Sequence, residues 1–311
     1  MPKTIALSSA SNAGFHFTNL YQCCQRKFFI KYVIRPVAHT LATSLIYGIA
    51  FHEGKAVFYK TKSETKAKRK VIAEVKKYET LFRSPEDFNK TLTQVPILLQ
   101  HWIAAFGWSD FERYDLIDVE GDYVQELPRM PGFVFTGRID AVVRDRKNNQ
   151  HYILETKTSR SSEGLTMNGV WYGDQATAYI WLASKKLNLD VVGVIADVAY
   201  WHNAAKYESN IKCLRSPEPI TRTKQDVYAF VLGLQQTFSE ISQKISAYEY
   251  GHDEAGLFPR NTFYCMSYGK PCEFADICRL KLKPYKMPIG FCKDRRKHSL
   301  GGMIEDQIAE S

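Results

Sequence analysis

The pattern of hydrophobic and polar positions predicts that the first third of the chain is helical. Apolar residues recur at helical spacing in "NAGFHFTNLYQCCQRKFFIKYV", where Ser11 and Asn12 are candidate N-caps. A second helix is predicted over "SLIYGIAFHEGKAVFYKTK", and a third over the charged stretch 62–78. A fourth helix is predicted in "EDFNKTLTQVPILLQHWIAAF", with Pro96 as its expected break.

The middle of the chain changes to a pattern typical of strands. Residues 122–130, 133–145 and 151–157 are rich in β-branched and aromatic side chains. Pro131-Gly132 marks one turn between these segments, and residues 147–150 mark the next, a short hairpin connection. This part of the chain therefore predicts neighbouring strands.

Helix and strand patterns then alternate again. A helix is predicted over 170–187, a strand over 191–201 and a long amphipathic helix over 225–250. The segment 251–311 is rich in cysteine, proline, aromatic and basic residues, and it resembles a small tethered module more than a second domain. The order of elements predicts an α/β fold.

Composition and charge narrow the class of protein. The chain has 311 residues, of which 45% are hydrophobic, enough for a substantial core. Its net charge of +9 favours a polyanionic partner such as nucleic acid, although a solvated basic surface without a partner would have the same charge. We find neither a signal peptide nor an apolar run of about 20 residues, and therefore expect a cytoplasmic protein without membrane contact.

Two acidic residues and a lysine form a candidate catalytic constellation. Asp140 and Glu155 lie near facing ends of two strands joined by a hairpin, so their carboxylates are expected to lie close enough to hold a divalent cation. Lys157 shares a strand face with Glu155, where it can position water or stabilise charge on a phosphate. The carbonyl of Thr156, between them, is a further candidate ligand. The alternative for Glu155 and Lys157 is an exposed ion pair.

His52 and the segment "DQATAY" add to this constellation. His52 follows Gly48 by four residues on one predicted helix face, and Gln175 and Tyr179 share a face of another helix. A lone helical histidine is more often a core residue than a ligand, and a buried tyrosine can serve packing alone. Both alternatives remain open at this point.

The seven cysteines indicate metal ligation more than disulfide bonding in a cytoplasmic protein. Cys265, Cys272 and Cys278 follow a C-x6-C-x5-C spacing, and Cys23 and Cys24 lie near the other end of the chain. Four thiolates suit a 4Fe–4S cluster or a structural zinc ion. The remaining cysteines, Cys213 and Cys292, are expected to be small buried side chains without a role.

Together, these residues resemble the RecB-like branch of the PD-(D/E)XK nuclease superfamily, which includes CRISPR-associated RecB-like exonucleases and phage exonucleases. The likeness runs through "GRID", "ETK" and the Q-x-x-x-Y pattern of Gln175 and Tyr179. It implies a restriction-endonuclease-like core, with a central mixed β-sheet flanked by helices. It also implies one nuclease domain over 1–311, composed of a helical part at 1–110, a nuclease core at 111–250 and a cluster-binding tail at 251–311.

The resemblance implies a role for each site residue. His52, Asp140, Glu155 and the Thr156 carbonyl would bind Mg²⁺ or Mn²⁺, and Lys157 would orient the attacking water. Gln175 and Tyr179 would help to hold DNA and to organise the site. The "CQRKFF" segment is similar to that of cluster-containing members, which implies Cys24 as the fourth ligand, with the adjacent Cys23 as the alternative. The cluster ligands would then be Cys24, Cys265, Cys272 and Cys278.

The expected function is metal-dependent hydrolysis of DNA from its ends, on single-stranded or end-frayed substrates, in recombination, repair or processing. No P-loop motif is present in the sequence, so unwinding would require a separate helicase or recombination partner. The long first gap of the cysteine spacing favours a phage protein acting in an infected or prokaryotic cell. The alternatives are a structure-specific or nicking endonuclease of the same superfamily and a non-catalytic iron–sulfur DNA-binding protein.

Overall fold

The computed structural model describes residues 14–38, 40–160, 163–201, 210–267, 270–279 and 291–293. The chain divides into two compact units, which we name by their contents. The sheet unit comprises residues 40–123 and 138–227. The cysteine unit comprises the described parts of 1–39, 124–137 and 228–311.

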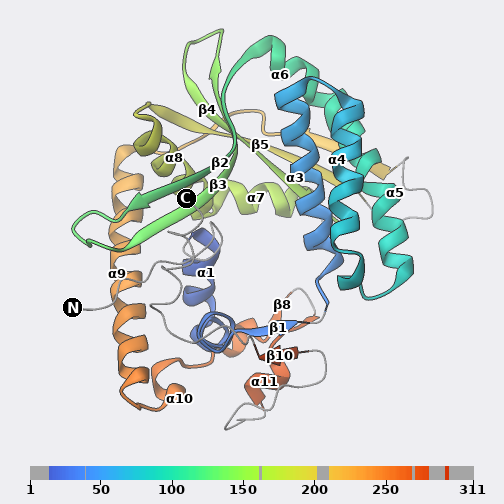
Figure 1. Ribbon diagram of the computed structural model, residues 1–311. Coiled ribbons are helices and arrows are strands. Elements are labelled where there is room, and N and C mark those ends of the chain that lie inside the picture. The colour runs from blue at the N-terminus through green and yellow to red at the C-terminus, as the bar shows by residue number, and fades with distance from the viewer. Residues whose placement is uncertain are drawn as a thin grey trace, which may run out of the picture. The chain divides into compact units, whose positions relative to one another are not determined.

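A six-stranded mixed β-sheet is the centre of the fold (Figure 1). The strand order is β2-β3-β4-β5-β6, and β7 also pairs with β5. The β3–β4 and β5–β6 pairs are antiparallel, whereas β4 and β5 are parallel. The strands are β2 (Tyr114–Glu126), β3 (Val134–Asp145), β4 (His151–Ser159), β5 (Val191–Trp201), β6 (Ile211–Arg215) and β7 (Ile220–Thr221).

Helices of the sheet unit form two groups. In the first group, α3, α4 and α5 pack against one another, α3 reaches β4, and α5 reaches β5 and β6. In the second group, α7 and α8 pack on β5 (Figure 1). The helices are α3 (Thr43–Thr61), α4 (Glu64–Lys77), α5 (Pro85–Trp102), α6 (Trp108–Arg113), α7 (Glu163–Tyr172) and α8 (Asp174–Leu187).

Burial along the strands shows that both sheet faces are covered. Leu154 of β4 and Ile195 of β5 belong to the core cluster that includes α3, α4 and α5. Their neighbours Ile153 and Val194 point to the other face and are also fully buried. The prediction of an α/β fold with a mixed sheet flanked by helices is therefore confirmed.

The cysteine unit is mainly helical and has an aromatic core. Phe28 and Phe29 are fully buried, Phe28 packs edge-on against Phe17, and Phe29 stacks on Phe258 with ring centroids 4.7 Å apart. Most of α9 lies in this unit. Its elements are α1 (Phe15–Cys23), α2 (Gln25–Phe28), β1 (Pro36–Ala38), α9 (Lys224–Glu249), α10 (Glu254–Leu257), β8 (Met266–Ser267), β9 (Lys270–Pro271), α11 (Ala275–Arg279) and β10 (Phe291–Lys293).

Several predicted boundaries are wrong. Pro96 lies inside α5 and does not break it, because the buried apolar face of this helix packs against α3 and α4 and offsets the lost hydrogen bond. The helix predicted over 170–187 is interrupted at Gly173, whose backbone is extended (φ −80°, ψ 151°) and which caps α8. β2 begins at Tyr114 and not at Asp122. The expected caps Ser11 and Asn12 lie outside the described residues.

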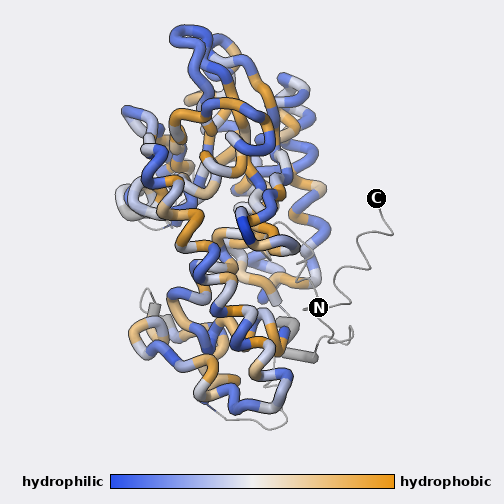
Figure 2. Tube along the Cα trace, turned by 90° about the vertical axis from the view of Figure 1, so that its left-hand side faces the viewer, coloured by the Kyte–Doolittle hydropathy of each residue, from blue (hydrophilic) through white to orange (hydrophobic). Residues whose placement is uncertain are grey.

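Hydrophobic and hydrophilic residues alternate along the chain trace (Figure 2). Among the described residues, no helix is long and apolar enough to cross a membrane.

Candidate active site

Strands β3 and β4 bring the predicted acidic residues together. Ala141 pairs with Leu154 in the antiparallel ladder, and Asp140 and Glu155 are the next residues outward from that pair. Both side chains are buried, with residue exposures of 7% and 3%. The hairpin predicted from the sequence therefore places two carboxylates at the same level of the sheet.

The Asp140 carboxylate is held by donors from two elements. Its Oδ2 accepts hydrogen bonds from the Thr156 amide at 2.9 Å and from Lys55 Nζ at 2.8 Å, and it lies 3.2 Å from His52 Nδ1. Burial alone would raise the pKa of Asp140, but the positive charges of His52 and Lys55 outweigh it and lower the pKa. Asp140 is therefore ionised at neutral pH and fixed in orientation.

Glu155 and Lys157 form an ion pair at the end of β4. Lys157 Nζ donates to Glu155 Oε1 at 2.6 Å. The second oxygen, Oε2, is buried and has no hydrogen-bond partner among the described residues. Burial, and then the negative charge of Asp140, raise the pKa of Glu155 against the opposing effect of Lys157. The pair is thus mostly buried, unlike the exposed pair that was the alternative interpretation.

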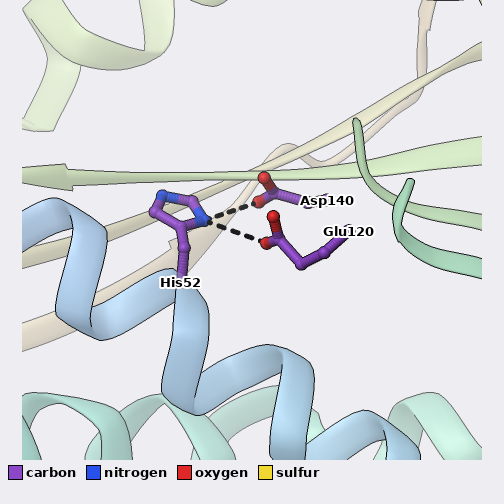
Figure 3. Close-up of side chains that lie close together, drawn as sticks. All are labelled: His52, Glu120 and Asp140. Atoms are coloured by element: carbon purple, nitrogen blue, oxygen red, sulfur yellow. Dashed lines mark ion pairs between the residues drawn. The ribbon is translucent and has the colours of Figure 1, made fainter. Parts of the chain in front are cut away.

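His52 lies in the site and not in the apolar core. Its Nδ1 faces Asp140 and, at 3.7 Å, Oε1 of Glu120 on β2 (Figure 3). Burial would lower the pKa of the imidazole, but the Asp140 and Glu120 carboxylates raise it to about 10. The potential ligand atoms of His52, Glu120 and Asp140 all lie within 4.8 Å of one another, and among the described residues this is the trio that could hold one metal ion.

Gln175 and Tyr179 lie one turn apart on α8. The Gln175 amide donates to the Tyr179 hydroxyl at 2.8 Å. Burial, followed by the negative charges of Glu155 and Asp140, raises the pKa of Tyr179 well above its usual value. Tyr179 is therefore a neutral hydroxyl within the electrostatic field of the carboxylates.

Thr156, between Glu155 and Lys157, is fully buried, and its hydroxyl lies 2.5 Å from Lys55 Nζ.

The sequence did not reveal the roles of Lys55 and Glu120. Lys55 follows His52 by three residues on α3, so helical spacing could have placed both on one face. It is 1% exposed, which is rare for lysine and requires the partners it has here. Glu120 lay outside every predicted strand, because the start of β2 was placed too late, and no spacing rule connects it to His52.

The predicted cluster cysteines line one cavity in the cysteine unit. Its volume is about 370 Å³, and Cys24, Cys265, Cys272 and Cys278 all line it. Cys24 is buried, and its Sγ accepts a hydrogen bond from the Asn261 amide at 3.5 Å. The amide of Cys272 donates to the Cys265 carbonyl at 2.8 Å, which closes the turn between these two residues.

The chemistry of this cavity suits a thiolate-bound metal. Burial has the largest effect on Cys272 and Cys278 and raises the pKa of both thiols, which disfavours free thiolates, whereas Lys27 beside Cys272 and Arg260 and Arg26 beside Cys278 act in the opposite direction. Four basic side chains also line the cavity and can offset the negative charge of thiolates: Arg26, Lys27, Arg260 and Arg279. Cys213 on β6 is half-buried, and the side chain of Cys292 lies outside the described residues.

Comparisons with known proteins identify the family of the chain. Residues 18–279 match the family model described as the PD-(D/E)XK nuclease superfamily. No curated protein sequence matches the chain. Among solved structures, the protein SSO0001 is 18% identical, with a TM-score of 0.32, and the match covers 79% of this chain and 88% of that one.

A second solved structure is of an Eubacterium rectale protein named "Putative exonuclease". It is 12% identical, with a TM-score of 0.44, and the match covers 90% of this chain and 92% of that one. The family model covers most of the chain, including α3, the β3–β4 hairpin and α8, which carry the site. Members of this family are hydrolases that act on nucleic acids with divalent metal ions. The chain therefore belongs to the PD-(D/E)XK nuclease superfamily.

Proposed function

We propose that this protein is a metal-dependent DNA exonuclease of the RecB-like branch. The observation that carries the proposal is the arrangement of Asp140, Glu155 and Lys157 across the β3–β4 hairpin, with one Glu155 oxygen buried and without a hydrogen-bond partner among the described residues. A buried carboxylate oxygen without a donor is unfavourable unless a cation occupies the adjacent space. The site thus fits a divalent metal ion.

The residues that would hold Mg²⁺ or Mn²⁺ are His52, Asp140, Glu155 and the Thr156 carbonyl. Carboxylate oxygens suit both ions, and an imidazole favours Mn²⁺. A bound divalent cation supplies Lewis-acid stabilisation of the scissile phosphate and lowers the pKa of water. Lys157, anchored to Glu155, positions a water molecule for in-line attack and stabilises the negative charge that develops on the phosphate.

Gln175 and Tyr179 are the residues of this site that would contact DNA. Because the Tyr179 hydroxyl stays protonated, it can donate to a phosphate oxygen of DNA while Gln175 fixes its position. The net charge of +9 favours binding of the polyanionic strand. Aromatic side chains can stack on bases of a single-stranded or frayed end.

The four-cysteine cavity supports a 4Fe–4S cluster in the cysteine unit. Cys24, Cys265, Cys272 and Cys278 supply four thiolates, the donor set of such clusters, and the basic lining offsets their charge. A bound cluster would serve structure, because ligation from both ends of the sequence stabilises the folded unit. A structural zinc ion would use the same thiolates.

Cleavage assays on linear and closed circular DNA test the proposal. We expect Mn²⁺- or Mg²⁺-dependent loss of linear DNA and no cleavage of the closed circle. Lys157→Ala should reduce turnover by about 10²–10³-fold, the usual effect of removing one transition-state donor, while leaving DNA binding intact. Wild-type turnover in the variant would overturn the role of Lys157. Cleavage of the circle would instead indicate an endonuclease.

A further inference from the structure

Glu120 occupies an unusual backbone conformation on β2. Its φ is 53°, in the left-handed region that non-glycine residues seldom adopt. A Cβ on the next residue, Gly121, would lie 2.0 Å from Oδ2 of Asp118, so a larger residue there would require the Asp118 side chain to move. Glu120 therefore interrupts the extended backbone of β2.

The Glu120 carboxylate is also mostly buried and lacks a hydrogen-bond donor at one of its oxygens among the described residues. Its side chain is only 13% exposed, and its buried Oε1 accepts no hydrogen bond from the described residues. Strain and desolvation in one residue, next to a catalytic centre, are typical of a position kept for function.

The distances from Glu120 to its neighbours indicate which function its carboxylate can serve. Oε1 of Glu120 lies 3.7 Å from His52 Nδ1. One carboxylate oxygen of Glu120, one of Asp140 and one ring nitrogen of His52 all lie within 4.8 Å of one another. Bonds of about 2.0–2.2 Å to one cation would place ligand atoms at such separations. Figure 3 shows the imidazole and both carboxylates converging on one point from α3, β2 and β3. Glu155 does not belong to this trio.

We propose that Glu120 is a further protein ligand of the divalent cation in this nuclease site, beside His52 and Asp140. The inference rests on the proposed function, since the cation is the one that the reaction uses. It adds a third carboxylate to the set predicted from the sequence. An ion pair between Glu120 and His52 alone would not account for the left-handed φ, and at 3.7 Å His52 Nδ1 is too far away to give Glu120 Oε1 the hydrogen-bond donor that it lacks among the described residues.

Mn²⁺ binding to the full-length protein without DNA tests this inference. Free Mn²⁺ is measured by electron paramagnetic resonance for the wild type, Glu120→Gln and Asp122→Asn. Asp122 is the matched control, because it lies two residues further along β2, half-exposed and paired with Arg138. We expect Glu120→Gln to weaken Mn²⁺ binding about tenfold or more, and Asp122→Asn to leave it unchanged.

A second variant separates a ligand from a structural residue. Glu120→Gly relieves both the left-handed φ and the buried carboxylate, so it should raise the melting temperature of the metal-free protein by about 2–4 °C while still weakening Mn²⁺ binding. A lowered melting temperature with unchanged Mn²⁺ affinity would show that Glu120 only supports the fold, and would overturn the inference.

The two proposals fail in different ways. If the wild type binds Mn²⁺ and degrades linear DNA but Glu120→Gln binds Mn²⁺ equally well, only the role of Glu120 is wrong. If the wild type neither binds Mn²⁺ nor cleaves DNA, the proposed nuclease activity itself is wrong.

Discussion

At the scale of single residues, the site is organised around one oxygen atom. The Thr156 amide, Lys55 Nζ and His52 Nδ1 all approach Oδ2 of Asp140. Of the two carboxylate oxygens, Oδ1 therefore remains for a cation. Lys55 has a special place among these donors because it is a fully buried ammonium, which is stable only while its anionic partner is present.

Lys55 and Asp140 should therefore be strongly coupled in stability. We expect Lys55→Met to lower the free energy of unfolding by about 3–5 kcal/mol, because it leaves Asp140 buried with less compensation. The double variant Lys55→Met/Asp140→Asn should be more stable than the sum of the single effects by at least about 1 kcal/mol. Urea unfolding of the four proteins without metal measures this coupling. Strictly additive effects would show that Lys55 does not support the carboxylate.

At the scale of elements, α3 carries His52 and Lys55 and must approach its neighbours closely. A Cβ on Gly48 would lie 3.4 Å from Thr158 Oγ1 of β4. On another face, a Cβ on Gly54 would lie 2.3 Å from Val71 of α4 and 2.7 Å from Leu99 of α5, both fully buried. Gly54 therefore allows α3 to pack closely against α4 and α5, whereas the distance at Gly48 is that of an ordinary contact.

Two glycine-to-alanine substitutions test this packing. Gly54→Ala should lower the free energy of unfolding by about 1–3 kcal/mol, because Val71 and Leu99 have no space into which to move. Gly233→Ala in α9 is the matched control, since nothing lies within 4 Å of its added Cβ, and it should raise stability by about 0.5–1 kcal/mol through helix propensity. Chemical denaturation compares the two variants. Equal stability of both would contradict tight packing around α3.

Elements with strong periodicity could be predicted from the sequence, whereas those governed by tertiary packing could not. The helix predicted from Ser44 and the hairpin predicted at 147–150 agree with the structure, because amphipathic spacing and turn residues are local signals. Pro96 and Gly173 were misjudged because packing decided whether each helix continued. Motif spacing predicted Asp140, Glu155 and His52 as site residues, and the structure places Asp140 and His52 3.2 Å apart. The nearness of Glu120 to His52 could not be predicted, because it depends on the local backbone conformation of β2 and not on a regular spacing in the sequence.

At the scale of the whole molecule, the chain combines a sheet unit that contains the candidate active site with a cysteine unit that contains the thiol cavity. The cavity depends on cysteines that are distant in sequence, Cys24 on one side and Cys265–Cys278 on the other. Metal ligation across this separation would contribute to folding directly, since a site that forms only in the folded state adds its binding free energy to stability.

Neighbouring cysteines provide a matched test of the ligand set. Protein purified without oxygen should be brown and absorb near about 400 nm if the cavity holds iron and sulfur, and colourless if it holds zinc. Cys24→Ser should lose the bound metal and unfold at a lower temperature, whereas Cys23→Ser should keep both properties, since Cys24 and not Cys23 lines the cavity. Metal analysis and thermal melts distinguish the variants. Loss of metal from Cys23→Ser alone would reverse the assignment.

The separation of the four thiols also sets an order of events during synthesis. Cys24 leaves the ribosome early, whereas Cys265, Cys272 and Cys278 follow after every strand of the central sheet has been made. The sheet unit ends at Val227, about 40 residues before Cys265, so at about 5–20 residues per second the complete sheet unit has roughly 2–8 s in which to begin folding. If the four thiols hold a metal as proposed, the last of them would arrive on a chain in which the residues of the candidate active site have already been made. Under that proposal, a shortage of the metal would leave chains with a complete sheet unit and an incomplete cysteine unit.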